Sequence, residues 1–149
     1  IVPEKRQELT TEGGVNVIDN ITLMKNTIEE LHKYDIEVSL FIEPDIKQID
    51  AAAEIKSDYI EIHTGVFANA LSEEEQFDEL DKIRVAVKHA KKLGLGVNAG
   101  HGLDYQNIKI FRELTDIDEV SIGHSIIARA VFVGLKQAIH EMFDLIKKG

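Results

Sequence analysis

The chain has 149 residues, 44% of them hydrophobic and 30% charged, a balance typical of one globular domain rather than a disordered segment. Its formal net charge of −10 argues against nucleic-acid and anionic-membrane partners, because no basic stripe is present to neutralise phosphates. It contains no cysteine, which excludes disulfides, thiolate metal sites and cysteine nucleophiles. No apolar run approaches the ~18 residues that would indicate a membrane span.

Short segments rich in Val or Ile and bounded by turn residues predict four buried strands, at 37–42, 58–64, 94–100 and 118–124. Helical patterns occupy 20–34, 45–55, 72–93, 104–114 and 125–148. Ser72 before three glutamates predicts an N-cap, and Gly94 predicts the end of that helix. The alternation of strand and helix predicts βα units and a parallel sheet, in one α/β domain that spans residues 1–149.

The pattern leaves open whether the sheet is open or closed into a barrel. A closed eight-stranded barrel needs about 200 residues or more. If the fold is a barrel, we expect this chain to hold roughly its C-terminal half.

The N-terminal segment reads as the end of another apolar strand, followed by "PEKRQELTTEGG". Thr10 in this segment is a candidate ligand contact for a hydroxylated or phosphorylated group. It is equally able to cap a turn at the glycines that follow, and the residues alone favour the cap.

Histidines gather at the ends of the predicted strands. His63, His101 and His124 lie there, whereas the other three of the six histidines lie in helical patterns. Ligands of parallel α/β folds bind beyond the carboxyl ends of the strands. This partition is the strongest functional signal that the residues carry by themselves.

Glycines mark the last two strand ends. Gly100 and Gly102 flank His101, and Gly123 leads directly into the last helical pattern, where Ser125 is a candidate cap. Backbone N–H groups and a helix N-terminus suit a phosphate, so we expect a phosphate site here. The alternative is that Gly123 only permits close packing of strand and helix.

His101 and Glu61 are the candidate acid–base groups. An imidazole with an unperturbed pKa of ~6.5 exchanges protons near neutrality, although a histidine in a turn can simply bind a backbone carbonyl. Strand alternation places Glu61 and His63 on one face and Ile60 and Ile62 on the other. A charge within a sheet is costly, so Glu61 acts in catalysis, orients a neighbouring histidine or forms a structural ion pair.

Five motifs resemble the pyridoxine 5′-phosphate synthase family and run in the family's order: "VPEKRQELTTEGG", "SLFIEPD", "YIEIHTGVFANA", "GLGVNAGHGL" and "IGHSIIARAVFVGL". The resemblance implies a (β/α)8 TIM barrel, of which this chain carries the C-terminal strands and helices. It also implies an enzyme that condenses 1-deoxy-D-xylulose 5-phosphate with 3-amino-2-oxopropyl phosphate to form pyridoxine 5′-phosphate, phosphate and water.

The resemblance assigns roles to particular residues. The proton donor falls on His101, the group that stabilises charged intermediates on Glu61, the aminoketone-phosphate ligands on Gly102, Gly123 and His124, and a deoxyxylulose-phosphate contact on Thr10. The family further implies no metal, no organic cofactor, a cytoplasmic location and a homo-octamer.

The family's barrel begins with three strands that this sequence does not show, and these strands carry further catalytic groups. We therefore expect the 149 residues alone to be inactive. Two alternatives remain: another phosphosugar barrel of the isomerase or aldolase type, and a non-catalytic phosphometabolite-binding protein. No lysine lies at the four strand ends, which argues against a Schiff-base aldolase. A binding protein would not need Glu61 and His101 together.

Overall fold

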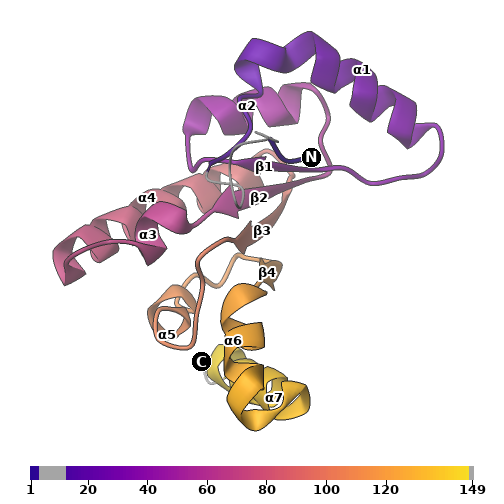
Figure 1. Cartoon of the computed structure of the whole chain (residues 1–149). Helices are drawn as coiled ribbons and strands as arrows, with labels where there is room; N and C mark the ends of the chain where they lie inside the picture. Colours follow the sequence, from indigo (N-terminus) through magenta and orange to yellow (C-terminus); the bar gives the residue numbers. More distant parts are fainter. Residues whose placement is uncertain (4–12, 148–149) are drawn as a thin grey trace.

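The computed structural model describes residues 1–3 and 13–147. Four strands form one parallel sheet in the order β1 (Ser39–Ile42), β2 (Tyr59–His63), β3 (Gly96–Gly100) and β4 (Glu119–Ser121). The helices are η1 (Ile18–Asn20), α1 (Ile21–His32), α2 (Ile46–Glu54), α3 (Gly65–Ala68), α4 (Glu73–Lys92), α5 (Ile108–Phe111), α6 (His124–Val133) and α7 (Leu135–Lys147), as Figure 1 shows. The predicted α/β class and parallel sheet are confirmed.

The structure also confirms the predicted start and end of the helix at 72–93. Ser72 caps α4 by accepting a hydrogen bond from the Glu75 N–H, and Gly94 adopts a φ of +84° directly after that helix. Residue 1 extends the sheet beyond β1, since the Phe41 N–H donates to the Ile1 carbonyl at 2.9 Å. The first residue therefore pairs with β1 as an apolar strand end would, although residues 1–3 form no strand of the described sheet.

Two predicted helices differ from the structure. The segment 104–114 forms only the single turn of α5, because beyond Phe111 the N–H groups of Glu113 and Leu114 bond to carbonyls three residues back and form turns. The prediction of a single helix over 125–148 is wrong. Gly134, with a φ of +83°, separates α6 from α7.

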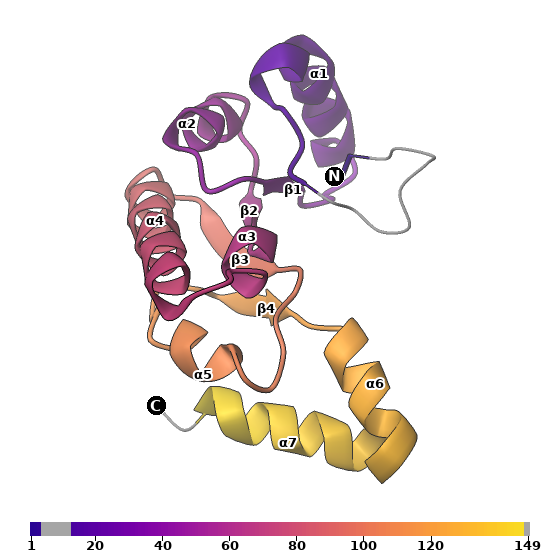
Figure 2. The same ribbon diagram turned by 60° about the vertical axis from the view of Figure 1, so that its left-hand side comes forward.

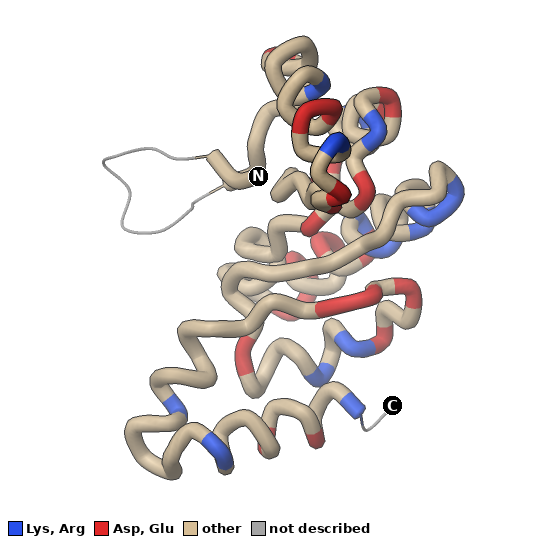
Figure 3. Tube along the Cα trace, turned by 90° about the vertical axis from the view of Figure 1, so that its right-hand side faces the viewer, with Lys and Arg blue, Asp and Glu red and all other residues tan. Residues whose placement is uncertain are grey.

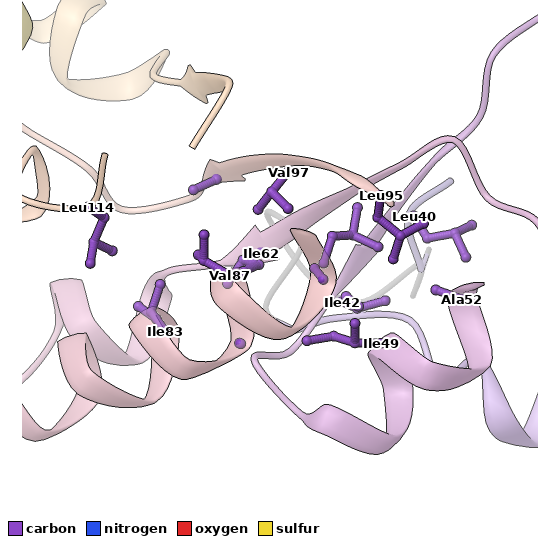
Figure 4. Close-up of a cluster of buried hydrophobic side chains, with 14 of the residues drawn as sticks. Leu40, Ile42, Ile49, Ala52, Ile62, Ile83, Val87, Leu95, Val97 and Leu114 are labelled. Carbon is purple, nitrogen blue, oxygen red and sulfur yellow. The ribbon is translucent and has the colours of Figure 1, made fainter. Parts of the chain in front are cut away.

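One face of the sheet packs on helices and forms the hydrophobic core. Alternate strand residues such as Leu40, Ile62 and Val97 are buried against Ile49 of α2 and Val87 of α4, as Figure 4 shows. Burial of Ile60 and Ile62 confirms the predicted facing of β2. Apolar burial of this kind supplies ~25 cal/mol per Å² and fixes the register of the strands.

The opposite face of the sheet is polar. The register aligns Glu61 with Asn98, and Asn98 with Glu119, across three neighbouring strands. Two buried atoms on this face, Ser39 Oγ and Asn98 Oδ1, lack hydrogen-bond partners among the described residues. A face with these residues is typical of the inside of a barrel rather than of a surface packed on helices.

The C-terminal helices lie at the β4 side of the molecule (Figure 2). α7 packs against α5, with Tyr105 Oη donating to the Ala138 carbonyl, whereas α6 has no buried residue. Lys and Arg residues are scattered over helices in different parts of the described chain, as Figure 3 shows, and form no continuous basic stripe there. Within those same residues, no helix has both the length and the apolar character needed to cross a bilayer.

Candidate active site

The turn after β3 holds His101 in an unusual backbone conformation. His101 has a φ of +79° and Gly102 a φ of +80°, which places a non-glycine residue in the left-handed region. Thr64, fully buried at the end of β2, shares its hydroxyl proton between the carbonyls of Gly100 (2.8 Å) and His101 (2.6 Å). Asn107 Nδ2 donates to the Gly102 carbonyl at 3.0 Å. The turn is therefore held from two sides, and its shape is part of the site.

Gly102 also requires the absence of a side chain. A Cβ built at this position would lie 2.6 Å from the Cβ of Ala68 in α3. The backbone of α3 and the turn after β3 thus approach each other closely, and only glycine permits that approach at a positive φ.

The start of α6 presents a second backbone element. α6 begins at His124 with Gly123 as its N-cap residue, and no side chain caps this end. Ser125 does not cap the helix, contrary to prediction, because its hydroxyl donates to the Leu103 carbonyl at 3.0 Å. Gly123 faces open space, with nothing within 4 Å of a built Cβ. Backbone N–H groups at such a helix start suit an anion.

These two elements meet in one cleft. A cavity of about 480 Å³ is lined by residues 101–104 and 121–125. The structure therefore brings together four of the predicted site residues, His101, Gly102, Gly123 and His124. This cleft lies where the carboxyl ends of β3 and β4 meet, the position at which parallel α/β folds bind ligands.

Glu61 lies beside this cleft. One of its carboxylate oxygens, Oε1, would be 2.3 Å from a Cβ at Gly100, and the carboxylate is hydrogen-bonded to Ser121, which lines the cavity. Burial raises the pKa of Glu61, and the Ser121 hydrogen bond offsets only part of this effect. No Lys or Arg side chain among the described residues pairs with it, so the structural ion pair is not seen there.

A second carboxylate, Glu43, binds a histidine at the adjoining strand ends. Glu43 Oε1 accepts from His63 Nδ1 at 2.9 Å and from the Gly14 N–H at 2.8 Å. The His63 hydrogen bond lowers the pKa of Glu43, partial burial acts against this, and the Gly14 N–H lowers it further. The ring centroids of His63 and His101 are 4.8 Å apart. The carboxylate that orients a histidine is therefore Glu43, not Glu61.

Sequence reasoning placed Glu43 and His63 at strand ends but did not include them among the site residues. Their positions could have identified them. Glu43 directly follows β1 and His63 ends β2, and each of these strands neighbours one that carries a predicted site residue. Thr10, the remaining predicted contact, lies outside the described residues. Among the residues that the structure describes, no group of three or more His, Asp or Glu side chains is arranged to hold a metal ion.

A larger open hollow of about 1230 Å³ lies at the other ends of the strands. Its charged groups bind one another: His32 pairs with Asp58, and Lys91 with Asp118. Asp58 and Asp118 also accept the backbone N–H groups of Val38 and Val97. These groups fix the starts of strands, so we assign this end to stability and the carboxyl end to function.

Comparison with known proteins agrees with this placement. A family model described as "Pyridoxal phosphate biosynthesis protein PdxJ" matches residues 1–148. Pyridoxine 5′-phosphate synthases from Geobacter metallireducens and Chlorobium luteolum are 53% and 54% identical over 147 and 146 residues, or 99% and 98% of this chain. The chain spans 62% of the length of each of these relatives.

Among solved structures, a chain of the Amycolatopsis orientalis BexX/CysO complex superposes with a TM-score of 0.50 at 13% identity, covering 84% of this chain and 50% of that one. This likeness supports the α/β fold alone. The family model, the two relatives and the cleft at the carboxyl ends of β3 and β4 lead to one conclusion. The chain belongs to the PdxJ family of pyridoxal phosphate biosynthesis proteins.

Proposed function

We propose that this chain forms part of a pyridoxine 5′-phosphate synthase and supplies its proton donor and one of its phosphate sites. The observation that carries the proposal is the cleft in which His101 and Gly102 face Gly123 and His124. An imidazole beside unoccupied backbone N–H groups suits a reaction that moves protons on a phosphorylated substrate.

In this proposal, Gly102, Gly123 and His124 bind the phosphate of 3-amino-2-oxopropyl phosphate. The N–H groups at the start of α6 supply hydrogen bonds and partial positive charge to the phosphate oxygens. The lack of side chains at both glycines allows the phosphate to reach the backbone. Thr10 contacts the second substrate, 1-deoxy-D-xylulose 5-phosphate.

The reaction that the family resemblance implies starts with attack of the amine on a ketone to give a Schiff base. Loss of water and phosphate, addition of water, ring closure and aromatisation follow, and each needs proton transfers. His101 donates a proton to a leaving or ring oxygen. Glu61, whose carboxylate lies over Gly100 at the edge of the cleft, stabilises the cationic iminium intermediates.

The polar face of the sheet supports a barrel in which this domain is the C-terminal portion. Glu61, Asn98 and Glu119 face the same side, and two buried polar atoms of that face have no partners among the described residues. Further strands of a closed barrel would cover this face. We propose that the complete enzyme is a cytoplasmic homo-octamer without metal or organic cofactor, and that residues 1–149 alone do not catalyse ring closure.

The test uses a completed barrel, in which this chain is joined to the part of the Geobacter metallireducens relative that it does not match. His101→Asn in the completed barrel is expected to lower kcat about 100-fold or more and to change KM little, because a general acid acts in the transition state. His140→Asn, on the exposed side of α7, is the matched control and is expected to match the unchanged barrel.

An unchanged kcat in the His101→Asn barrel would remove His101 from the catalytic groups. If the folded completed barrel binds its phosphorylated substrates but forms no product from them, the alternative of a non-catalytic phosphometabolite-binding protein is favoured. Ring closure by residues 1–149 alone would contradict the proposal that they carry only part of the acid–base set.

A further inference from the structure

Glu43, His63 and His101 form a chain of contacts that the proposed reaction does not yet use. Glu43 is bound to His63, and the His63 ring lies against both His101 and Phe41, with centroids 4.8 and 5.3 Å away. The three polar groups come from the ends of three neighbouring strands. They meet because the strands are parallel and in register.

The different surroundings of the two ring nitrogens of His63 define which of them carries a proton. Its side chain is only 6% exposed, and its Nδ1 is 2.9 Å from a Glu43 oxygen, which can only accept. Nδ1 therefore carries a proton. The other ring nitrogen, Nε2, is buried without a partner among the described residues. A proton there would leave a buried, charged N–H unsatisfied, so the neutral Nδ1–H form is favoured.

The positive charge of the histidine pair then falls on His101. Two charged imidazoles with ring centroids 4.8 Å apart would repel each other. The pair therefore carries one positive charge rather than two. His101 is less buried than His63 and lines both adjoining cavities.

Glu43 supplies the compensating negative charge. The hydrogen bond from His63 lowers its pKa most, the Gly14 N–H lowers it further, and the attraction of a charged His101 acts in the same direction. An attraction between two groups is mutual, so the carboxylate stabilises a charged imidazole by the same interaction.

We propose that Glu43 and His63 are positioning residues, which keep His101 charged and oriented as the proton donor. This inference rests on the proposed function, because it assigns the two residues to the same proton transfer. His63 acts through its fixed tautomer and its ring contact, and Glu43 acts through its charge.

Among the described residues, other charged groups line the same two cavities as His101. From α4, Glu75 and Glu79 line the same 800 Å³ cavity as His63 and His101. Glu75 accepts from the Leu71 N–H, and Glu79 binds Lys82.

Across the other cavity, Asp104 and His124 line its wall with His101. Asp104 accepts from two backbone N–H groups of its own turn. Glu43 is the carboxylate that is hydrogen-bonded to the imidazole pair, through His63 Nδ1.

The test compares Glu43→Gln with Glu54→Gln in the completed barrel. Both variants remove one negative charge, but Glu54 lies exposed at the end of α2. A glutamine at 43 still offers an oxygen to Nδ1–H. A reaction that needs a protonated donor loses rate as pH rises. In Glu43→Gln this fall in kcat is expected about one pH unit lower than in the unchanged barrel, with about tenfold less activity at the alkaline end.

KM is expected to stay within about twofold, and Glu54→Gln is expected to leave the pH profile unchanged. A purely structural Glu43 would lower activity at every pH without moving the profile. Superimposable profiles for Glu43→Gln, Glu54→Gln and the unchanged barrel would overturn the inference.

A second measurement separates this inference from the proposed function. Imidazole ¹⁵N spectra of the completed barrel report the tautomer of His63 and the titration of His101 without any assay. We expect the neutral Nδ1–H tautomer for His63, and a lower titration midpoint for His101 in Glu43→Gln.

If the barrel makes no product but these spectra appear, the proposed function fails and the Glu43–His63–His101 coupling stands. A His63 that is charged or Nε2–H in the unchanged barrel would overturn the positioning role, whatever the activity.

Discussion

Replacement of Thr64 by valine tests whether one buried hydroxyl holds the catalytic turn. Valine keeps the shape of threonine but cannot donate to the carbonyls of Gly100 and His101. The Gly100 carbonyl keeps the Thr64 backbone N–H at 2.9 Å, so the main loss is the part-buried hydrogen bond from the Thr64 hydroxyl to the His101 carbonyl. Loss of one such hydrogen bond costs about 0.5–1.5 kcal/mol. For a chain of this length, that lowers Tm by about 1–6 °C.

The loss of that hydrogen bond also affects function, because a positive φ costs a non-glycine residue about 1–2 kcal/mol and the Thr64 hydroxyl is one of the groups that hold the turn in this conformation. Thermal unfolding measures the stability, and the kcat of the completed barrel measures the position of His101. Thr64→Ser is the matched control: it loses a buried methyl group but keeps the hydroxyl.

We expect both variants to lose stability, and kcat to fall far more in Thr64→Val than in Thr64→Ser. Equal kcat values for the two variants would refute the claim that the hydroxyl holds His101 in place. A Tm for Thr64→Val equal to that of the unchanged protein would refute the claim that the bond is made.

Three further predictions concern backbone strain and ionisation. Gly102→Ala is expected to lower Tm more than Gly94→Ala, because both glycines have a positive φ but only Gly102 also meets a neighbouring side chain; equal losses would show that the contact is not made. Burial raises the pKa of Glu61 above its ordinary 4.5, so the folded state binds more protons there and stability falls as pH rises above 4.5. Glu61→Gln should remove this slope in urea unfolding and lower kcat about 100-fold, and an unchanged slope would contradict the burial effect. The hydrogen bond from Lys91 and then the one from the Val97 backbone N–H hold the pKa of Asp118 below its ordinary 3.8. The stabilisation that ionised Asp118 provides is therefore present above pH 3.8 and is lost as the pH falls through the lowered pKa. Asp118→Asn should therefore cost about 0.5–1 kcal/mol at pH 7 and nothing at pH 2, and an equal cost at both would show that the charge plays no part.

The sequence predicted the sheet and its functional edge because those signals are local. Alternation in the β2 segment predicted that Ile60 and Ile62 would be buried, and the positions of His101 and Gly123 placed them at strand ends. Periodicity failed where a side chain or a glycine overrides it. Gly134 interrupts an apolar pattern that continues on both sides, and beyond Phe111 the backbone forms turns with three-residue hydrogen bonds where the pattern predicted a continuing helix.

The pairing of Glu43 with His63 could not be predicted from local sequence patterns. Their contact depends on the register of β1 against β2, which places Ile42 opposite Ile62 and so brings the next residues together. For the hydroxyl of Ser125, the sequence likewise predicted only the start of its own helix as a partner. Only the packing of α6 beside the turn after β3 selects the Leu103 carbonyl.

Product formation by the completed barrel tests the central claim most directly. With both phosphorylated substrates, the account predicts pyridoxine 5′-phosphate by mass spectrometry, release of inorganic phosphate, and no product from residues 1–149 alone. A folded completed barrel that binds the aminoketone phosphate but forms no pyridoxine 5′-phosphate would contradict it.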